Sequence, residues 1–136
     1  MSPILLSPYD QLLHECHTFK ANLESQAHAL RYDRGLERNG DVFRAVVRLS
    51  LQTDRILELG LRMIADTPDN NITRRYPSYW SREGDTSKFE TVFHRLERDL
   101  DQMALALNSD PSQETCQEIA ERLEEIAGQV VFDFGL

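Results

Sequence analysis

The sequence predicts an all-α protein, and three observations support that prediction. Apolar residues recur at three- and four-residue steps along four separate stretches, which is the spacing that places them on one face of a helix. Serine, aspartate and proline stand where such stretches begin, as they do at helix N-termini. Two of the three connections between the stretches are short. We therefore expect an antiparallel four-helix bundle with one long connection, between its second and third helices.

Size and composition favour a single helical-bundle domain over residues 1–136. Hydrophobic residues make up 40% of the chain and charged residues 28%, as in an ordinary globular domain. No apolar stretch approaches the roughly 18 residues of a membrane span, and no basic residue precedes the short apolar run at the N-terminus. Cys16 and Cys116 are too few for a disulfide framework. We expect reduced thiols, no membrane contact and a cytoplasmic location.

The first helix is expected to run from Pro8 to about Arg34. Ser7 suits the N-cap position and Pro8 the first turn, and Gly35 follows as an end signal. The predicted apolar stripe comprises Tyr9, Leu12, Cys16, Phe19, Leu23 and Leu30, with Gln26 as its one polar member.

The second helix is expected over about residues 41–66, after a turn and cap at Asn39-Gly40-Asp41. Its stripe is Val42, Val46, Leu49, Ile56 and Met63. Further apolar residues widen that stripe, so we expect this helix to contact two neighbours. Residues 67–86 have no helical period and contain two prolines. A connection this long inside a compact domain is usually functional or disordered.

The third helix is expected from Ser87, which forms a capping box with Glu90, to near Asn108. Its inward residues are Val92 or Phe93, with Phe89, Leu96, Leu100, Met103 and Leu107. The fourth helix is expected to begin with Asp110 as its cap and to stop at Gly128. Its inward residues are Cys116, Ile119, Ala120, Leu123, Ile126 and Ala127, whereas Glu114, Glu118, Glu121 and Glu125 line its outer side. The apolar tail after Gly128 would cover the core or a partner.

Charge is distributed unevenly along the chain, whose formal net charge is −8. Residues 31–82 contain ten arginines and seven acids, whereas residues 83–136 contain four basic and thirteen acidic residues. Such segregation usually concerns association rather than fold. The acidic total disfavours a general nucleic-acid coat and leaves a local site open. The acidic fourth helix suits a basic partner surface, including that of a second copy of this chain.

The leading candidate for a binding surface is the basic-aromatic segment, residues 74–82. Its six candidate contact residues are Arg74, Arg75, Tyr76, Tyr79, Trp80 and Arg82. Arginine, tyrosine and tryptophan dominate the hot spots of protein interfaces. The same residue types hold phosphates and stack on unpaired bases. A third interpretation is that the rings fold the loop back over the end of the bundle, and the composition leaves all three open.

A secondary basic face is predicted on the solvent side of the second helix. It consists of Arg44, Arg48, Arg55 and Arg62. Such a face can track a phosphate backbone, but more often it is solvated or pairs with acids elsewhere in the fold or oligomer. The latter interpretation is favoured here.

Candidate chemistry is sparse. The run His14-Glu15-Cys16-His17 contains zinc-ligand types, but Cys16 turns into the apolar stripe, so a structural role is favoured. Glu24 with His28, and Glu90 with His94, lack the Glu-x-x-His spacing of di-metal bundles. No glycine-rich phosphate loop or nucleophile elbow occurs. We expect no catalytic residue, no metal, no cofactor and no small-molecule substrate.

These observations predict a non-enzymatic binding or regulatory protein, an adaptor or inhibitor that acts through protein–protein contacts of the basic-aromatic segment. A protein partner or self-association is expected. The alternative is an accessory protein of replication, repair or transcription that contacts single-stranded nucleic acid through the same segment.

Overall fold

A computed structural model describes residues 8–32, 36–66 and 87–134 of the chain. These residues form four helices and no strand. The helices are α1 (Pro8–Tyr32), α2 (Leu36–Asp66), α4 (Ser87–Leu107) and α5 (Gln113–Phe134). The predicted all-α class is thereby confirmed. The long connection predicted at residues 67–86 lies outside the described residues.

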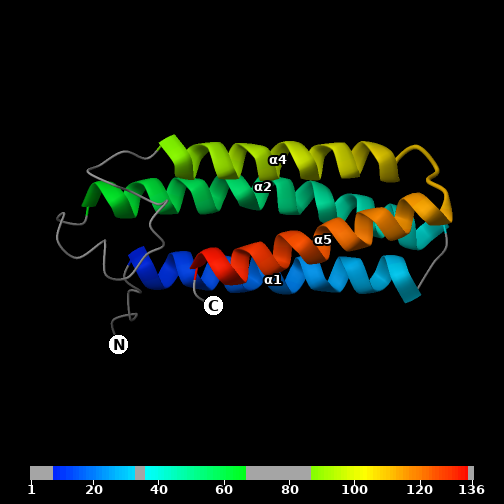
Figure 1. Ribbon diagram of the computed structural model, residues 1–136, viewed down its shortest axis with the longest axis horizontal. Helices are drawn as coiled ribbons and strands as arrows, with labels where there is room; N and C mark the ends of the chain where they lie inside the picture. Colours follow the sequence, from blue (N-terminus) through cyan, green and yellow to red (C-terminus); the bar gives the residue numbers. More distant parts are fainter. Residues whose placement is uncertain (1–7, 33–35, 67–86, 135–136) are drawn as a thin grey trace, which may run out of the picture.

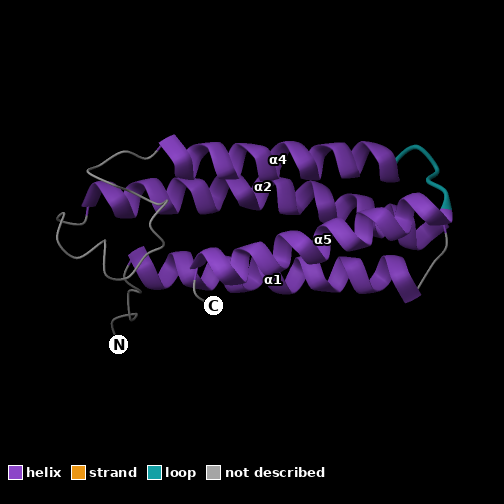
Figure 2. Cartoon of the chain, in the orientation of Figure 1, coloured by secondary structure: helices purple, strands orange, loops and turns teal. Residues whose placement is uncertain are grey.

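The four helices run alternately up and down, so that sequential helices are antiparallel (Figures 1 and 2). The closest packing joins α1 to α5 and α2 to α4, and α1 also packs along α2. By contrast, α4 and α5 touch each other little. In the view of Figure 1, α5 leans away from α4 toward its C-terminal end. The molecule is a four-helix bundle with three closely packed sides and one looser side.

The core follows the predicted stripes closely. On α1, every predicted apolar position whose side chain is described is buried, and Ala27 joins them. On α4, Phe93 is buried while Val92 is only partly covered, which settles the choice between those two residues. The prediction that α2 contacts two neighbours is confirmed, since α2 packs against α1 and α4. Helix α2 also buries Thr53, whose hydroxyl donates to the backbone carbonyl of Ser50.

The turn predicted at Asn39-Gly40-Asp41 is wrong, because α2 begins at Leu36 and passes through all three residues. Asp41 is an exposed helical residue that forms an ion pair with Arg44. Glycine inside a helix costs about 1 kcal/mol relative to alanine, a penalty that the packing of a 31-residue helix overrides.

The fourth predicted helix differs from the sequence prediction at both ends. Ser112, rather than Asp110, is the N-cap of α5: its Oγ accepts a hydrogen bond from the backbone N–H of Thr115 at 3.1 Å. Asp110 instead has a positive φ of 53°, a conformation that aspartate tolerates better than most residues. The predicted stop at Gly128 is also wrong, because α5 continues to Phe134.

Two further predictions concern the thiols and the membrane. Cys16 and Cys116 are free and buried, and burial, followed by the nearby charge of Glu15, raises the pKa of the Cys16 thiol. Cys16 lies near the start of α1, whereas Cys116 lies at the opposite end of the bundle, near the start of α5. Of the described helices, none is long and apolar enough to cross a membrane.

Gly40→Ala tests the corrected start of α2, and Gly128→Ala tests the corrected end of α5. A Cβ at Gly40 would meet only the Arg44 guanidinium at 3.8 Å, and one at Gly128 would meet nothing within 4 Å. Each variant should therefore raise the free energy of unfolding by about 0.5–1 kcal/mol, measured by urea denaturation. Gln102→Ala, at an exposed position within α4, is the control and should have a smaller effect, because glutamine is already a good helix former. Destabilisation by Gly40→Ala would instead indicate the turn.

Candidate functional site: the groove between α4 and α5

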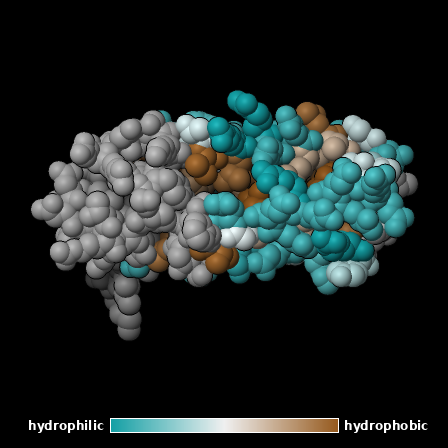
Figure 3. Space-filling model, in the orientation of Figure 1, coloured by the Kyte–Doolittle hydropathy of each residue, from teal (hydrophilic) through white to brown (hydrophobic). Residues whose placement is uncertain are grey.

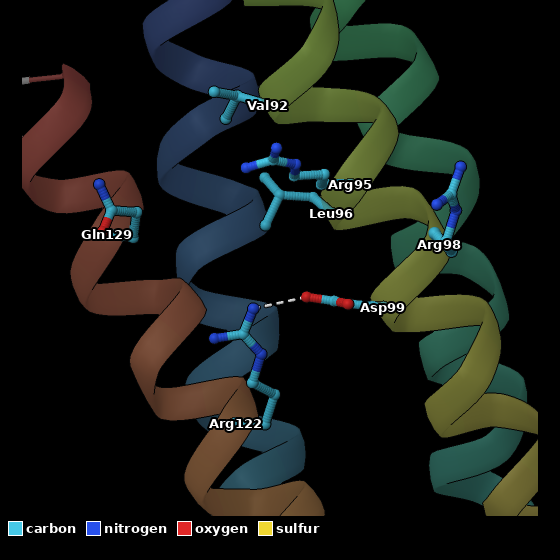
Figure 4. A pocket seen from close by; sticks show the side chains of 7 residues that line it. All are labelled: Val92, Arg95, Leu96, Arg98, Asp99, Arg122 and Gln129. Atoms are coloured by element: carbon cyan, nitrogen blue, oxygen red, sulfur yellow. Dashed lines mark hydrogen bonds and ion pairs between the residues drawn. The ribbon is translucent and has the colours of Figure 1, made fainter.

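The looser side of the bundle forms a groove between α4 and α5 with a volume of about 530 Å³. In the space-filling view, apolar residues show along this face between bands of hydrophilic ones (Figure 3). The groove is lined by Val92, Arg95, Leu96, Arg98, Asp99, Arg122 and Gln129 (Figure 4). It is an open depression with an apolar base and charged walls.

Helical periodicity places these residues on the flanks of their helices. Val92, Leu96 and Asp99 follow one another at four- and three-residue steps on α4, so they share one side of that helix. Arg122 and Gln129 are seven residues apart on α5 and share a side in the same way. Leu96 is buried and Val92 is half-buried, so the apolar part of the lining is continuous with the core.

An ion pair between Asp99 of α4 and Arg122 of α5 crosses the groove (Figure 4). Arg122 also donates a hydrogen bond of 3.0 Å to Glu125. The hydrogen bond to Asp99, and secondarily the one to Glu125, raises the pKa of the Arg122 guanidinium above its already high usual value. Arg122 is therefore charged at every physiological pH, and its charge is compensated by two carboxylates.

Arg95 differs from Arg122, because it has no ion-pair partner within the described part of the chain. Its side chain extends from α4 toward α5, whereas that of Arg98 points away from α5 (Figure 4). The lining residues carry three arginines and one aspartate. The groove is thus a positively charged site on a protein whose formal net charge is −8.

The sequence did not predict this groove. The one sequence feature that pointed toward it was the pair Val92 and Phe93, because two adjacent apolar residues widen the apolar stripe of α4 to one side. That signal indicates a broad apolar face without saying whether another helix covers the extra residue.

The six residues predicted as partner contacts in the basic-aromatic segment all lie outside the described residues. The helices on either side of the connection that contains this segment are described. Asp66 ends α2 and Ser87 begins α4, at the end of the bundle where α1 begins and α5 ends (Figure 1). Ser87 is five residues before Val92 of the groove.

The predicted secondary basic face on α2 is exposed, as expected: the side chains of Arg44, Arg55 and Arg62 are 63%, 58% and 59% accessible. Three acids lie against it. Arg44 pairs with Asp41, Arg62 pairs with Glu58, and Arg55 lies 3.8 Å from Glu15 of α1. Arg48 has no such partner within the described ranges; it borders a smaller polar hollow between α1 and α2. Most of this face is therefore locally neutralised.

Polar contacts also join α2 to α4. The Ser50 hydroxyl donates to Asp101 at 2.6 Å, and one turn away Glu97 shares a hydrogen bond with Asp54. That hydrogen bond, then burial and the negative charges of Asp54 and Asp101, raise the pKa of Glu97, while His94 lowers it. Across residues 8–32, 36–66 and 87–134, no group of three His, Cys, Asp or Glu residues is placed to hold a metal ion.

The histidine- and cysteine-containing run on α1 does not converge on one point. Cys16 is buried, whereas His14 and His17 are exposed. Helix geometry thus separates the sulfur from both imidazoles, as the sequence predicted.

Comparisons with protein-family models, with curated proteins and with solved structures each find no match for this chain.

The Asp54–Glu97 contact predicts a pH-dependent stability. Because the folded-state pKa of Glu97 is raised above its usual value of 4.5, its contribution is present below that value and is lost as pH rises through the raised pKa. Glu97→Gln should therefore stabilise the protein at neutral pH, by a few tenths of a kcal/mol up to about 1 kcal/mol, since solvent screens the partly exposed pair. The gain should shrink as pH falls through the raised pKa of Glu97 and should be absent below 4.5.

Urea denaturation between pH 4 and pH 8 measures this effect. Glu118→Gln, on the exposed side of α5, removes the same charge away from Asp54 and is the control for the change in net charge. A Glu97→Gln variant less stable than wild type at neutral pH would contradict the prediction.

Proposed function

We propose that this protein is a non-enzymatic binding module that holds a helical segment of a protein partner in the groove between α4 and α5. The observation that carries this proposal is the groove itself: an apolar base left open because α4 and α5 pack on other helices rather than on each other. Recognition of an amphipathic helix by an apolar groove is a common mode of protein–protein interaction.

The dimensions of the groove support a helical partner. Asp99 lies seven residue steps after Val92 on α4, and Gln129 lies seven steps after Arg122 on α5, so each wall is about 10 Å long at 1.5 Å per residue. A partner helix presents its apolar anchors over the same length, from position i to position i+7. The partner would lie as an additional helix against α4 and α5, with its anchors on Val92 and Leu96.

The basic-aromatic segment is the second part of the proposed binding surface, and it rests on the sequence alone. The connection that contains it ends where α4 begins at Ser87, five residues before Val92, so a partner that extends past Val92 toward the start of α4 comes near Ser87. Arg74, Arg75 and Arg82 would supply charge-assisted hydrogen bonds, and Tyr76, Tyr79 and Trp80 would supply buried area. An adaptor or inhibitor role and a cytoplasmic location remain sequence predictions.

The alternative, contact with single-stranded nucleic acid, gains little support from the described residues. A surface that follows a phosphate backbone needs arginines that are free to neutralise phosphates, which releases the counterions of the nucleic acid. On α2, three of the four candidate arginines lie against carboxylates. This alternative therefore depends on the basic-aromatic segment alone.

Val92→Asn tests the proposed groove by replacing an apolar side chain with a polar one of no charge. Amphipathic helical peptides selected from a display library against the wild-type protein should bind with micromolar affinity. Val92→Asn should weaken that binding about fivefold, because roughly 1 kcal/mol of apolar contact is lost. Val47→Asn, at a valine 38% exposed on α2, is the matched control and should bind like wild type. Selection of no binder, or of binders indifferent to Val92→Asn, would contradict the proposal.

Trp80 is the only tryptophan, so its fluorescence reports on the basic-aromatic segment alone. Titration with a single-stranded oligonucleotide at low and at physiological salt should leave the emission unchanged if the partner is a protein. Replacing both Tyr79 and Trp80 with alanine should weaken capture of a partner obtained through the groove. Saturable quenching that salt reverses would instead favour the nucleic-acid alternative, because backbone binding falls steeply with salt.

A further inference from the structure

We infer that the groove between α4 and α5 selects an acidic amphipathic helix, and that Arg95 is the residue that determines this preference. The inference rests on the proposed function, since it names the chemistry of the partner for the same groove. It depends on the ion pairs around the groove and on the direction of the Arg95 side chain.

Charge complementarity points to an acidic partner. The groove lining has three arginines against one aspartate. Asp99 and Glu125 already engage Arg122, so the charge of Arg122 is largely compensated before any partner arrives. Arg98 borders the groove but points away from α5 (Figure 4). Among the described lining residues, the uncompensated charge that extends into the groove is therefore that of Arg95.

The position of Arg95 fixes where the partner's acid would lie. Arg95 stands between the apolar residues Val92 and Leu96 in sequence and one turn before Asp99. A carboxylate on the partner would thus meet Arg95 while neighbouring apolar residues of the same helix contact Val92 and Leu96. A guanidinium offers several donors in one plane and pairs well with a carboxylate. A basic partner would instead bring like charges together beside an apolar surface, where repulsion is poorly screened.

The geometry separates the roles of the two arginines. Arg122 forms the ion pair with Asp99 that joins the two walls of the groove. Arg95 takes no part in that connection and is exposed. A change at Arg95 should therefore alter partner preference while leaving the groove in place.

The test uses two synthetic helical peptides with the same apolar residues at i, i+3, i+4 and i+7, flanked by glutamate in one and by lysine in the other. Fluorescence anisotropy gives the two dissociation constants, and amide chemical shifts of the ¹⁵N-labelled protein show where each peptide binds. We expect the glutamate peptide to bind about tenfold more tightly to wild type, with shifts over residues 92–99 and 122–129. Arg95→Glu should reverse that order.

Arg48→Glu is the matched control: Arg48 is likewise exposed and unpaired among the described residues, but it lies on α2 away from the groove. It should leave the order of the two peptides unchanged. If both peptides shift the groove amides with equal affinity, the acidic preference is wrong and the proposed function stands. If the order reverses equally with Arg48→Glu, the preference reflects overall charge and the inference is wrong. If neither peptide shifts the groove amides, the proposed function fails as well.

Discussion

The bundle consists of two antiparallel pairs, α1 with α5 and α2 with α4, which are joined through the packing of α1 along α2. On the fourth side, the ion pair between Asp99 and Arg122 connects α4 to α5. A partly exposed ion pair contributes about 0.2–1 kcal/mol, whereas burying one large apolar side chain contributes about 1.5–3 kcal/mol. Helices α4 and α5 are therefore held in place by their partner helices more than by each other. That imbalance leaves the flank carrying Val92 only partly covered, and so creates the groove.

The distribution of charge along the sequence does not match the distribution of charge over the folded surface. Residues 31–82 carry the excess of arginine, yet the arginines of α2 lie mostly against Asp41, Glu58 and Glu15. The groove lies in the most acidic part of the chain, residues 83–136. It is nevertheless positive, because its lining contains three arginines and one carboxylate, that of Asp99, which is paired with Arg122. Net charge over a stretch of sequence thus says little about the field at a helix flank, where spacing decides which side chains meet.

The periodicity of apolar residues was enough to predict the four helices and most of the core, because a buried stripe at three- and four-residue steps leaves few alternatives. The errors occurred where local signals compete with packing. Gly40 and Gly128 resemble turn and stop signals, but each lies inside a helix that continues past it. Asp110 and Ser112 are both residue types that cap helices well, and the hydrogen bond from the backbone N–H of Thr115 identifies Ser112 as the cap. The groove could not be predicted from the sequence, because the role of a residue such as Arg95 depends on which two helix flanks face each other in the bundle.

Stability and binding are linked at the side of the bundle between α4 and α5. A partner that binds only the folded protein adds RT ln(1 + [L]/Kd) to its stability, about 2.7 kcal/mol at a hundredfold excess over Kd. That exceeds what the Asp99–Arg122 pair itself contributes at a surface, so an occupant of the groove would do more than this ion pair to hold α4 and α5 together. Closing the same gap with larger apolar side chains would stabilise the free protein and remove the place where a partner helix fits. A weakly joined pair of helices is therefore what a groove-binding function requires, and the three closely packed sides supply most of the stability of the bundle.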